Sequence, residues 1–161
     1  MLPGKKQMIT KIDNYSLNQP IEEAPDLEEF TPEEYLNFEM AGMKLMFKDE
    51  KIYHGNNVCF ADPIRKVWDT VIGATEGKIY KISIQHMVQD KNESNAWFRL
   101  TLGYLGIKMG KYNEHPFLSK VYIWDSPEGN VILNQVSKFG HYSINLFLTS
   151  SSIRKQYAEH R

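Results

Sequence analysis

Cys59 is the only cysteine of the 161-residue chain, and His54 precedes it by five residues. A cysteine becomes a nucleophile when a base within reach removes its proton, so this pair is the first candidate for covalent chemistry. We expect the two residues on adjoining strand segments, where their separation does not promise that geometry. Because Cys59 stands between Val58 and Phe60, and free cysteines are commonly buried among apolar neighbours, the pattern favours a structural cysteine.

Metal and acid–base chemistry have equally little support in the sequence. The five histidines are scattered, and none has the spacing that would place two ligands on one element, which leaves only a metal site assembled from distant parts. Asp125 and Glu128 flank the stretch DSPEG, and two neighbouring carboxylates can do acid–base work. That stretch is also ordinary turn chemistry, since Asp bonds to turn amides and Gly accepts a positive φ, and we favour the turn.

The stretch from Gly103 to Tyr112, GYLGIKMGKY, ends in Gly-Lys and invites comparison with a phosphate-binding loop. The loop pattern would need glycine at position 105 and serine or threonine at 112, where Leu105 and Tyr112 stand. The G-x-x-G at 103–106 lies in an apolar helical run without basic neighbours, so it is a weak match to an RNA-binding loop. No catalytic motif is complete, and the sequence favours a non-enzymatic protein without cofactor or metal.

The overall composition is that of one ordinary globular domain. The chain is 42% hydrophobic and 24% charged with a net charge of −1, which makes nucleic acid an unfavoured partner. It has no stretch apolar enough for a signal peptide or a membrane span, and one cysteine cannot form an internal disulfide. We therefore expect a single domain over 1–161 in the cytoplasm, with 1–29 as an N-terminal arm that is extended in particular over 18–29.

Acidic residues are concentrated in one segment of the chain. Residues 22–50 hold ten acids against two lysines, a net charge of −8, while the rest is mildly cationic. Within this run Thr31, Pro32 and Glu34 predict a helix start with a capping box, and Phe30 with Tyr35 a hydrophobic staple. Five further acids lie outside that helix and have no such structural reason: Glu22, Glu23, Asp26, Glu28 and Glu29.

The middle of the chain alternates between predicted strands and helices. Residues 43–47 and 51–54 indicate a hairpin, 57–60 a short strand, and 62–73 an amphipathic helix capped by Asp62. Residues 78–88 alternate, with Tyr80, Ile82 and Ile84 on one face and Lys81, Ser83 and Gln85 on a wet face.

The next run, 95–109, is apolar almost all round and predicts the most buried helix, with Gly103 and Gly106 in close packing. After it, short turns separate three runs rich in β-branched and aromatic residues, 119–125, 130–137 and 142–149. These runs predict a C-terminal three-stranded meander, and the polar tail predicts a last helical turn or two. The fold class expected is α+β, a mainly antiparallel sheet packed by two or three helices.

Strand alternation also predicts a recognition face. In VYIWD we expect Val121 and Ile123 to face the core and Tyr122 and Trp124 the opposite side. Asn134, Ser143, Asn145 and Phe147 on the neighbouring strands would share a face of the sheet. Tyr, Trp and Asn on an open sheet serve recognition, unless a helix or the arm covers them as a second core layer.

Two hypotheses follow. The first is a protein that binds another protein, because an acidic patch speeds association with a basic partner. Its partner-binding residues would be Glu22, Glu23, Asp26, Glu28, Glu29, Tyr122, Trp124 and Asn134.

Over roughly residues 75–150 the general character of the sequence resembles that of the small bacterial immunity proteins encoded beside secreted toxins. The segments that carry this resemblance are GKIYKISIQ, VYIWDSPEGNVILNQ and SINLFLTSS. That resemblance implies tight, stoichiometric blocking of a toxin or enzyme. The second hypothesis is a small-ligand-binding protein or enzyme with an apolar aromatic pocket between the long helix and the meander. Trp97, Tyr104, Tyr122 and Trp124 would line that pocket.

Overall fold

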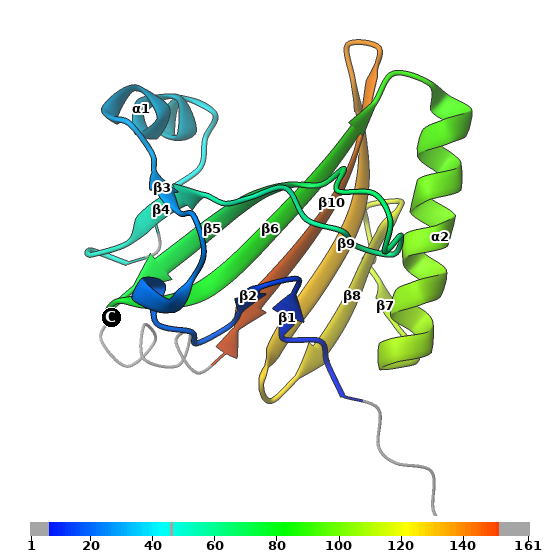
Figure 1. Cartoon of the computed structure of the whole chain (residues 1–161). Helices are drawn as coiled ribbons and strands as arrows, with labels where there is room; N and C mark the ends of the chain where they lie inside the picture. The colour runs from blue at the N-terminus through cyan, green and yellow to red at the C-terminus, as the bar shows by residue number, and fades with distance from the viewer. Residues whose placement is uncertain (1–6, 46, 152–161) are drawn as a thin grey trace, which may run out of the picture.

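The computed structural model describes residues 7–45 and 47–151, whose main element is one eight-stranded sheet (Figure 1). The strand order is β3-β4-β5-β6-β10-β9-β8-β7, and all neighbouring strands are antiparallel. The strands are β3 (Glu28–Glu29), β4 (Lys51–His54), β5 (Asp69–Thr75), β6 (Lys78–Val88), β7 (Asn113–Glu114), β8 (Val121–Ser126), β9 (Gly129–Lys138) and β10 (His141–Ser150). The α+β fold with an antiparallel sheet of at least five strands is therefore confirmed.

The predicted C-terminal meander is present as β8, β9 and β10. Between β9 and β10 the two central turn residues, Phe139 and Gly140, have φ values of 52° and 77°. Positive φ at both positions defines the hairpin turn whose twist matches that of the strands. Between β8 and β9 the Ser126 hydroxyl accepts a hydrogen bond from the Glu128 amide at 3.2 Å, so DSPEG is a turn as expected.

Helix α2 (Lys91–Met109) lies along one face of the sheet and contacts β6 and β10 (Figure 1). It is the more buried of the two α-helices in the described residues, because α1 (Pro32–Met40) has no buried residue. The expectation that it is buried all round is wrong, since Leu100 and Ile107 are exposed. The predicted close packing at Gly103 and Gly106 is also wrong, because a Cβ at either position would meet nothing within 4 Å.

The helix predicted over 62–73 is absent, and β5 takes its place near the middle of the sheet. Trp68, Thr70 and Ile72 are all buried, which is the two-residue repeat of a strand. The spacing of four residues between Trp68 and Ile72 fits the repeat of a helix as well as that of a strand. The β-branched run 70–72 favours a strand. The Asp62 side chain instead accepts a hydrogen bond from the amide of Ile64, which is 88% exposed.

The hairpin predicted at 43–54 is half right. Residues 51–54 form β4, but 43–45 and 47 form no strand, and β4 pairs with β5 instead. The short strand predicted at 57–60 is reduced to a single bridge between Val58 and Trp68. The expected helical turn in the polar tail after Ser151 lies outside the described residues.

The N-terminal segment is packed against the sheet rather than standing away from it. Its strands β1 (Lys11–Ile12) and β2 (Tyr15–Ser16) form a small hairpin, and Ile12, Tyr15 and Leu17 are buried in the main core. The segment 18–29, expected to be extended, includes a 3-10 turn, η1 (Ile21–Glu23), and strand β3. Backbone bonds join Asn18 and Gln19 to Ile79 at 2.7 and 2.9 Å. The segment therefore closes the end of the core.

Candidate functional site

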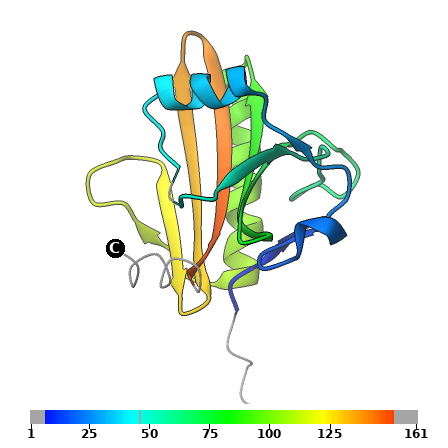
Figure 2. The same ribbon diagram turned by 90° about the vertical axis from the view of Figure 1, so that its left-hand side faces the viewer.

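The two faces of the sheet have different surroundings. Helix α2 covers one face, while α1 lies on the opposite side, where it crosses in front of β9 and β10 (Figure 2). The face toward α1 carries the polar side chains predicted for it from strand alternation, among them Lys81, Ser83 and Gln85. We call this the open face of the sheet.

Tyr122 and Trp124 are on the other face, and the predicted phase of β8 is wrong. Trp124 is 5% exposed, and its indole nitrogen donates to the Gly110 carbonyl at 3.1 Å. Tyr122 packs against Phe98 of α2 with ring centroids 5.7 Å apart. The alternation along β8 is as expected, but Tyr122 and Trp124 face the core in place of Val121 and Ile123. The reason is that the larger aromatic rings bury more apolar area.

This placement affects both hypotheses about function. Trp124 is not accessible to a partner in this fold. Of the four aromatic side chains expected to line a pocket between α2 and the meander, Trp97 and Trp124 are buried in the core and Tyr122 packs on α2. Tyr104 is 36% exposed and packs against Phe60.

Asn134 is on the open face as expected, and it belongs to a ladder of amides across three strands. The Asn145 amide nitrogen donates to Asn134 Oδ1 at 2.8 Å, and Gln85 Nε2 donates to Asn145 Oδ1 at 2.9 Å. Asn145 is buried, and its amide group is satisfied within the sheet. The ladder gives the open face a rigid polar strip from β9 to β6.

Helix α1 is anchored at its N-terminal end. Thr31 and Glu34 form the predicted capping box, and Phe30 packs edge-on against Tyr35 with centroids 5.7 Å apart. The Tyr35 hydroxyl accepts a hydrogen bond from the Ile52 amide of β4 at 2.9 Å. The Glu34 carboxylate contacts the His54 ring, also on β4. Both predictions for this helix start are therefore confirmed, and the contacts fix α1 to the edge of the sheet.

Beyond that anchor, α1 and the residues after it expose apolar side chains. Leu36 is 54% exposed and Met40 is 77% exposed. Met43 and Leu45, which follow the helix, are exposed as well. A helix of a globular protein normally turns its apolar stripe toward a core. We call Leu36, Met40, Met43 and Leu45 the α1 patch.

The five acidic residues singled out in the sequence are all exposed and come from η1, the turn after it and β3. Asp26 accepts a hydrogen bond from the Asn56 amide at 2.8 Å, and Glu29 lies 3.8 Å from Lys51. Glu28 and Glu29 form the edge strand of the sheet, where charged side chains discourage pairing with another chain. The acidic side chains of Glu28 and Glu29 are therefore explained by their place on the sheet edge, which the sequence did not reveal. Glu22 and Glu23 have solvent around them.

A half-open cavity of about 530 Å³ lies between the open face and the α1 region. Its floor comes from β5, β6 and β10, and its other wall from Phe30, Phe38 and Met43. Tyr80 also lines it, against expectation, because an irregularity in the β5–β6 pairing shifts the phase of the strand there. Lys81 lies in this cavity, where burial lowers the pKa of its ammonium and the nearby Glu50 carboxylate partly opposes that shift.

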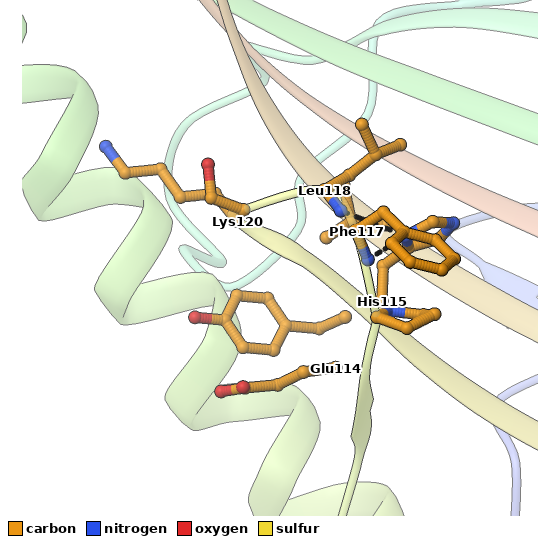
Figure 3. A pocket seen from close by; sticks show the side chains of 9 residues that line it. Glu114, His115, Phe117, Leu118 and Lys120 are labelled. Atoms are coloured by element: carbon orange, nitrogen blue, oxygen red, sulfur yellow. Dashed lines mark hydrogen bonds between the residues drawn. The ribbon is translucent and has the colours of Figure 1, made fainter.

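A second hollow, of about 430 Å³, lies within the loop from Glu114 to Tyr122 (Figure 3). His115 Nδ1 accepts hydrogen bonds from the amides of Phe117 and Leu118, both at 3.1 Å, and this closes the loop on itself. Figure 3 shows His115 and Phe117 together on one side, with Glu114 and Lys120 pointing to the other. Phe117 and Leu118 are exposed. The hollow has no buried polar group that would hold a ligand.

The candidates for chemistry are not assembled by the fold. The His54 ring nitrogen contacts Glu34, and Cys59 is half-buried rather than fully buried beside the Val58 bridge. Across residues 7–45 and 47–151, no group of three or more potential ligand side chains is placed to hold a metal ion. No helix in the same residues is long and apolar enough to cross a membrane.

The chain matches no protein-family model, no curated protein and no solved structure. Functional inference therefore starts from the α1 patch, the acidic segment 22–50 that contains it and the cavity.

Proposed function

We propose that this protein binds another protein, without catalysing a reaction, through the α1 patch and the acidic segment 22–50 in which the patch lies. The observation that carries the proposal is that α1 buries none of its residues while Leu36 and Met40 stand in solvent. Exposed apolar groups surrounded by charged residues are the usual composition of an interface centre and its rim. Methionine suits such a centre because its flexible, polarizable side chain adapts to a partner.

The surrounding charge selects the kind of partner. The patch lies within residues 22–50, whose net charge is −8. An anionic surface attracts a basic partner over distances of about 10 Å at 0.1 M salt and penalises an acidic one. The partner is therefore a protein with an apolar centre and a basic rim.

The finer proposal is an inhibitor or immunity protein of the bacterial cytoplasm that neutralises a toxin or enzyme by covering it. Support comes from the acidic surface, which suits blocking of a basic active site or substrate channel, and from the resemblance of residues 75–150 to immunity proteins. The single cysteine agrees with a reducing compartment. Asn134 and its amide ladder would extend the surface if the partner reaches the open face.

The test is affinity capture from an extract of the native host with tagged wild type and two double variants. Leu36→Ser with Met40→Ser removes the centre of the α1 patch. Ile64→Ser with Phe139→Ser removes two side chains that are each 88% exposed, more than Leu36 or Met40, and that lie far from α1 in the sequence. Because α1 contributes nothing to the core, both variants should keep the melting temperature of the wild type.

We expect the wild type and the control to capture the same protein in one-to-one ratio, and the α1 variant to lose it. If the captured protein is an enzyme or toxin, the finer proposal requires that one equivalent of this chain abolish its activity. Equal capture by both variants would contradict binding through α1.

A further inference from the structure

The cavity under α1 has the size and composition of a small-molecule site. Its volume of about 530 Å³ falls within the range of about 300–1,000 Å³ typical of ligand pockets. Phe38 and Met43 from the α1 region face a floor made by β5, β6 and β10. The cavity shares Met43 with the α1 patch, but Leu36, Met40 and Leu45 do not line it.

The floor carries a row of polar groups between apolar walls. Lys81, Ser83 and Gln85 follow one another at every second position of β6 and all line the cavity. Ser83 pairs with Val71 on one side and with Phe147 on the other, so its hydroxyl lies between two apolar side chains. The lining also includes the charged residues Lys44, Glu50 and Asp69. An ammonium and a hydroxyl beside the apolar side chains of this trough can bind a ligand with one polar end.

Two of these polar groups, Lys81 and Ser83, form no ion pair or side-chain hydrogen bond with the residues that the structure describes. No carboxylate oxygen in the described residues lies within 4.0 Å of Lys81 Nζ, whose contact is instead with the Phe147 ring, 5.3 Å from its centroid. In the same residues the Ser83 hydroxyl has no hydrogen-bond partner, in contrast to Gln85 and Asn145, which satisfy each other. A half-buried ammonium over an aromatic ring gains most from an anion that arrives from outside.

Burial supports the same conclusion. The pKa of Lys81 is lowered because the cavity removes its ammonium from water, and Glu50 offsets this only in part. Because Glu50 offsets only part of the cost of burying Lys81, the position costs the fold stability until a further anion joins it, as binding sites often do. It follows that replacing Lys81 with an uncharged side chain of similar length should not destabilise the protein.

We propose that this cavity binds a small organic carboxylate with an apolar body. The carboxylate pairs with Lys81 and accepts a hydrogen bond from Ser83, and the apolar body packs between Phe38, Met43 and Val71. An aromatic or short aliphatic body fits the volume with room to spare. The site works without the protein partner of the α1 patch, so either proposal can fail alone.

The test is a calorimetric titration of the full chain with 1-naphthoate, and with 1-naphthalenemethanol as a neutral compound of the same ring. The variant is Lys81→Met. The matched control is Lys108→Met, because Lys108 also lies over an aromatic ring, 5.7 Å from the Tyr104 centroid, but on the outside of α2. We expect saturable one-to-one binding of 1-naphthoate by the wild type and the control. The neutral compound, and Lys81→Met with the acid, should each bind about tenfold more weakly, as expected from losing a charge-assisted hydrogen bond.

A second measurement works on the wild type alone and does not require any variant to fold. Reductive methylation followed by peptide mapping reports how fast each lysine reacts, with and without 1-naphthoate. We expect the compound to slow the reaction at Lys81 several-fold and to leave Lys108 unchanged. The proposal is overturned if 1-naphthoate does not saturate the wild type at millimolar concentration, if Lys81→Met binds it equally well, or if Lys81 is not protected.

Discussion

The Glu34 carboxylate joins the start of α1 to strand β4. It closes the capping box by accepting from the Thr31 amide at 3.0 Å, and it also contacts the His54 ring of β4. The Thr31 hydrogen bond, and after it the one from His54, lower the pKa of Glu34 below its ordinary value of 4.5. A carboxyl whose pKa is lower in the folded than in the unfolded protein binds fewer protons when folded, so it stabilises the fold only while it is ionised.

The prediction at the residue scale concerns how the stability of the fold changes at low pH. The stabilisation from Glu34 is complete above pH 4.5 and is lost as the pH falls through the lowered native value. Glu34→Gln should therefore be less stable than the wild type at pH 7, and the difference should shrink below pH 4.5. Urea unfolding at pH 7, 5, 4 and 3 measures it. Glu33→Gln is the control, because Glu33 has no hydrogen bond or ion pair with any described residue; an equal pH-dependent difference in that variant would contradict the account.

The element scale is where local sequence signals succeeded and failed for identifiable reasons. The start of α1 could be predicted because Thr31, Pro32 and Glu34 act within one turn and need nothing from the rest of the fold. The region 62–73 could not, since the spacing of Trp68 and Ile72 fits a helix as well as a strand. The pairing of β5 with β4 and β6 makes this region a strand. Local sequence patterns do not show this pairing, because the partner strands are other segments of the chain.

Helix α1 should open independently of the sheet, since it buries none of its residues. Thr31→Ala removes the N-cap and should cost about 1 kcal/mol, which corresponds to roughly fivefold faster amide exchange if it acts on local opening. We expect this acceleration in the α1 amides, with those of β6 and β10 unchanged. Native-state hydrogen exchange measures it, and Thr31→Ser, which keeps the cap, is the control. Equal acceleration in β6 and β10 would show that α1 opens only with the whole fold.

At the scale of the whole molecule, α2 closes one face of the sheet, while α1 and the residues that follow it lie on the side of the other face (Figure 2). The antiparallel sheet of at least five strands could be predicted, although β5 was not among the strands expected. The polar side of β6 could also be predicted, because Lys81, Ser83 and Gln85 alternate clearly with Ile82 and Ile84. The face taken by Trp124 could not, because alternation fixes the period of a strand but not which side the core will occupy. The cavity was equally beyond the sequence, since Phe38 and Lys81 meet only through the folded chain.

The central claim is that the α1 patch and the acidic segment 22–50 bind a basic partner protein. The most direct test replaces the five acids outside α1 with lysine: Glu22, Glu23, Asp26, Glu28 and Glu29. Lysine on the edge strand still discourages pairing, so the melting temperature should barely change.

The measurement is the association rate with the captured partner at low and at high salt, for the wild type and the five-site variant. Our account predicts that association is several-fold slower in the variant at low salt, and that the difference shrinks as salt rises because exposed charges are screened. An association rate equal to that of the wild type at both salt concentrations would contradict it.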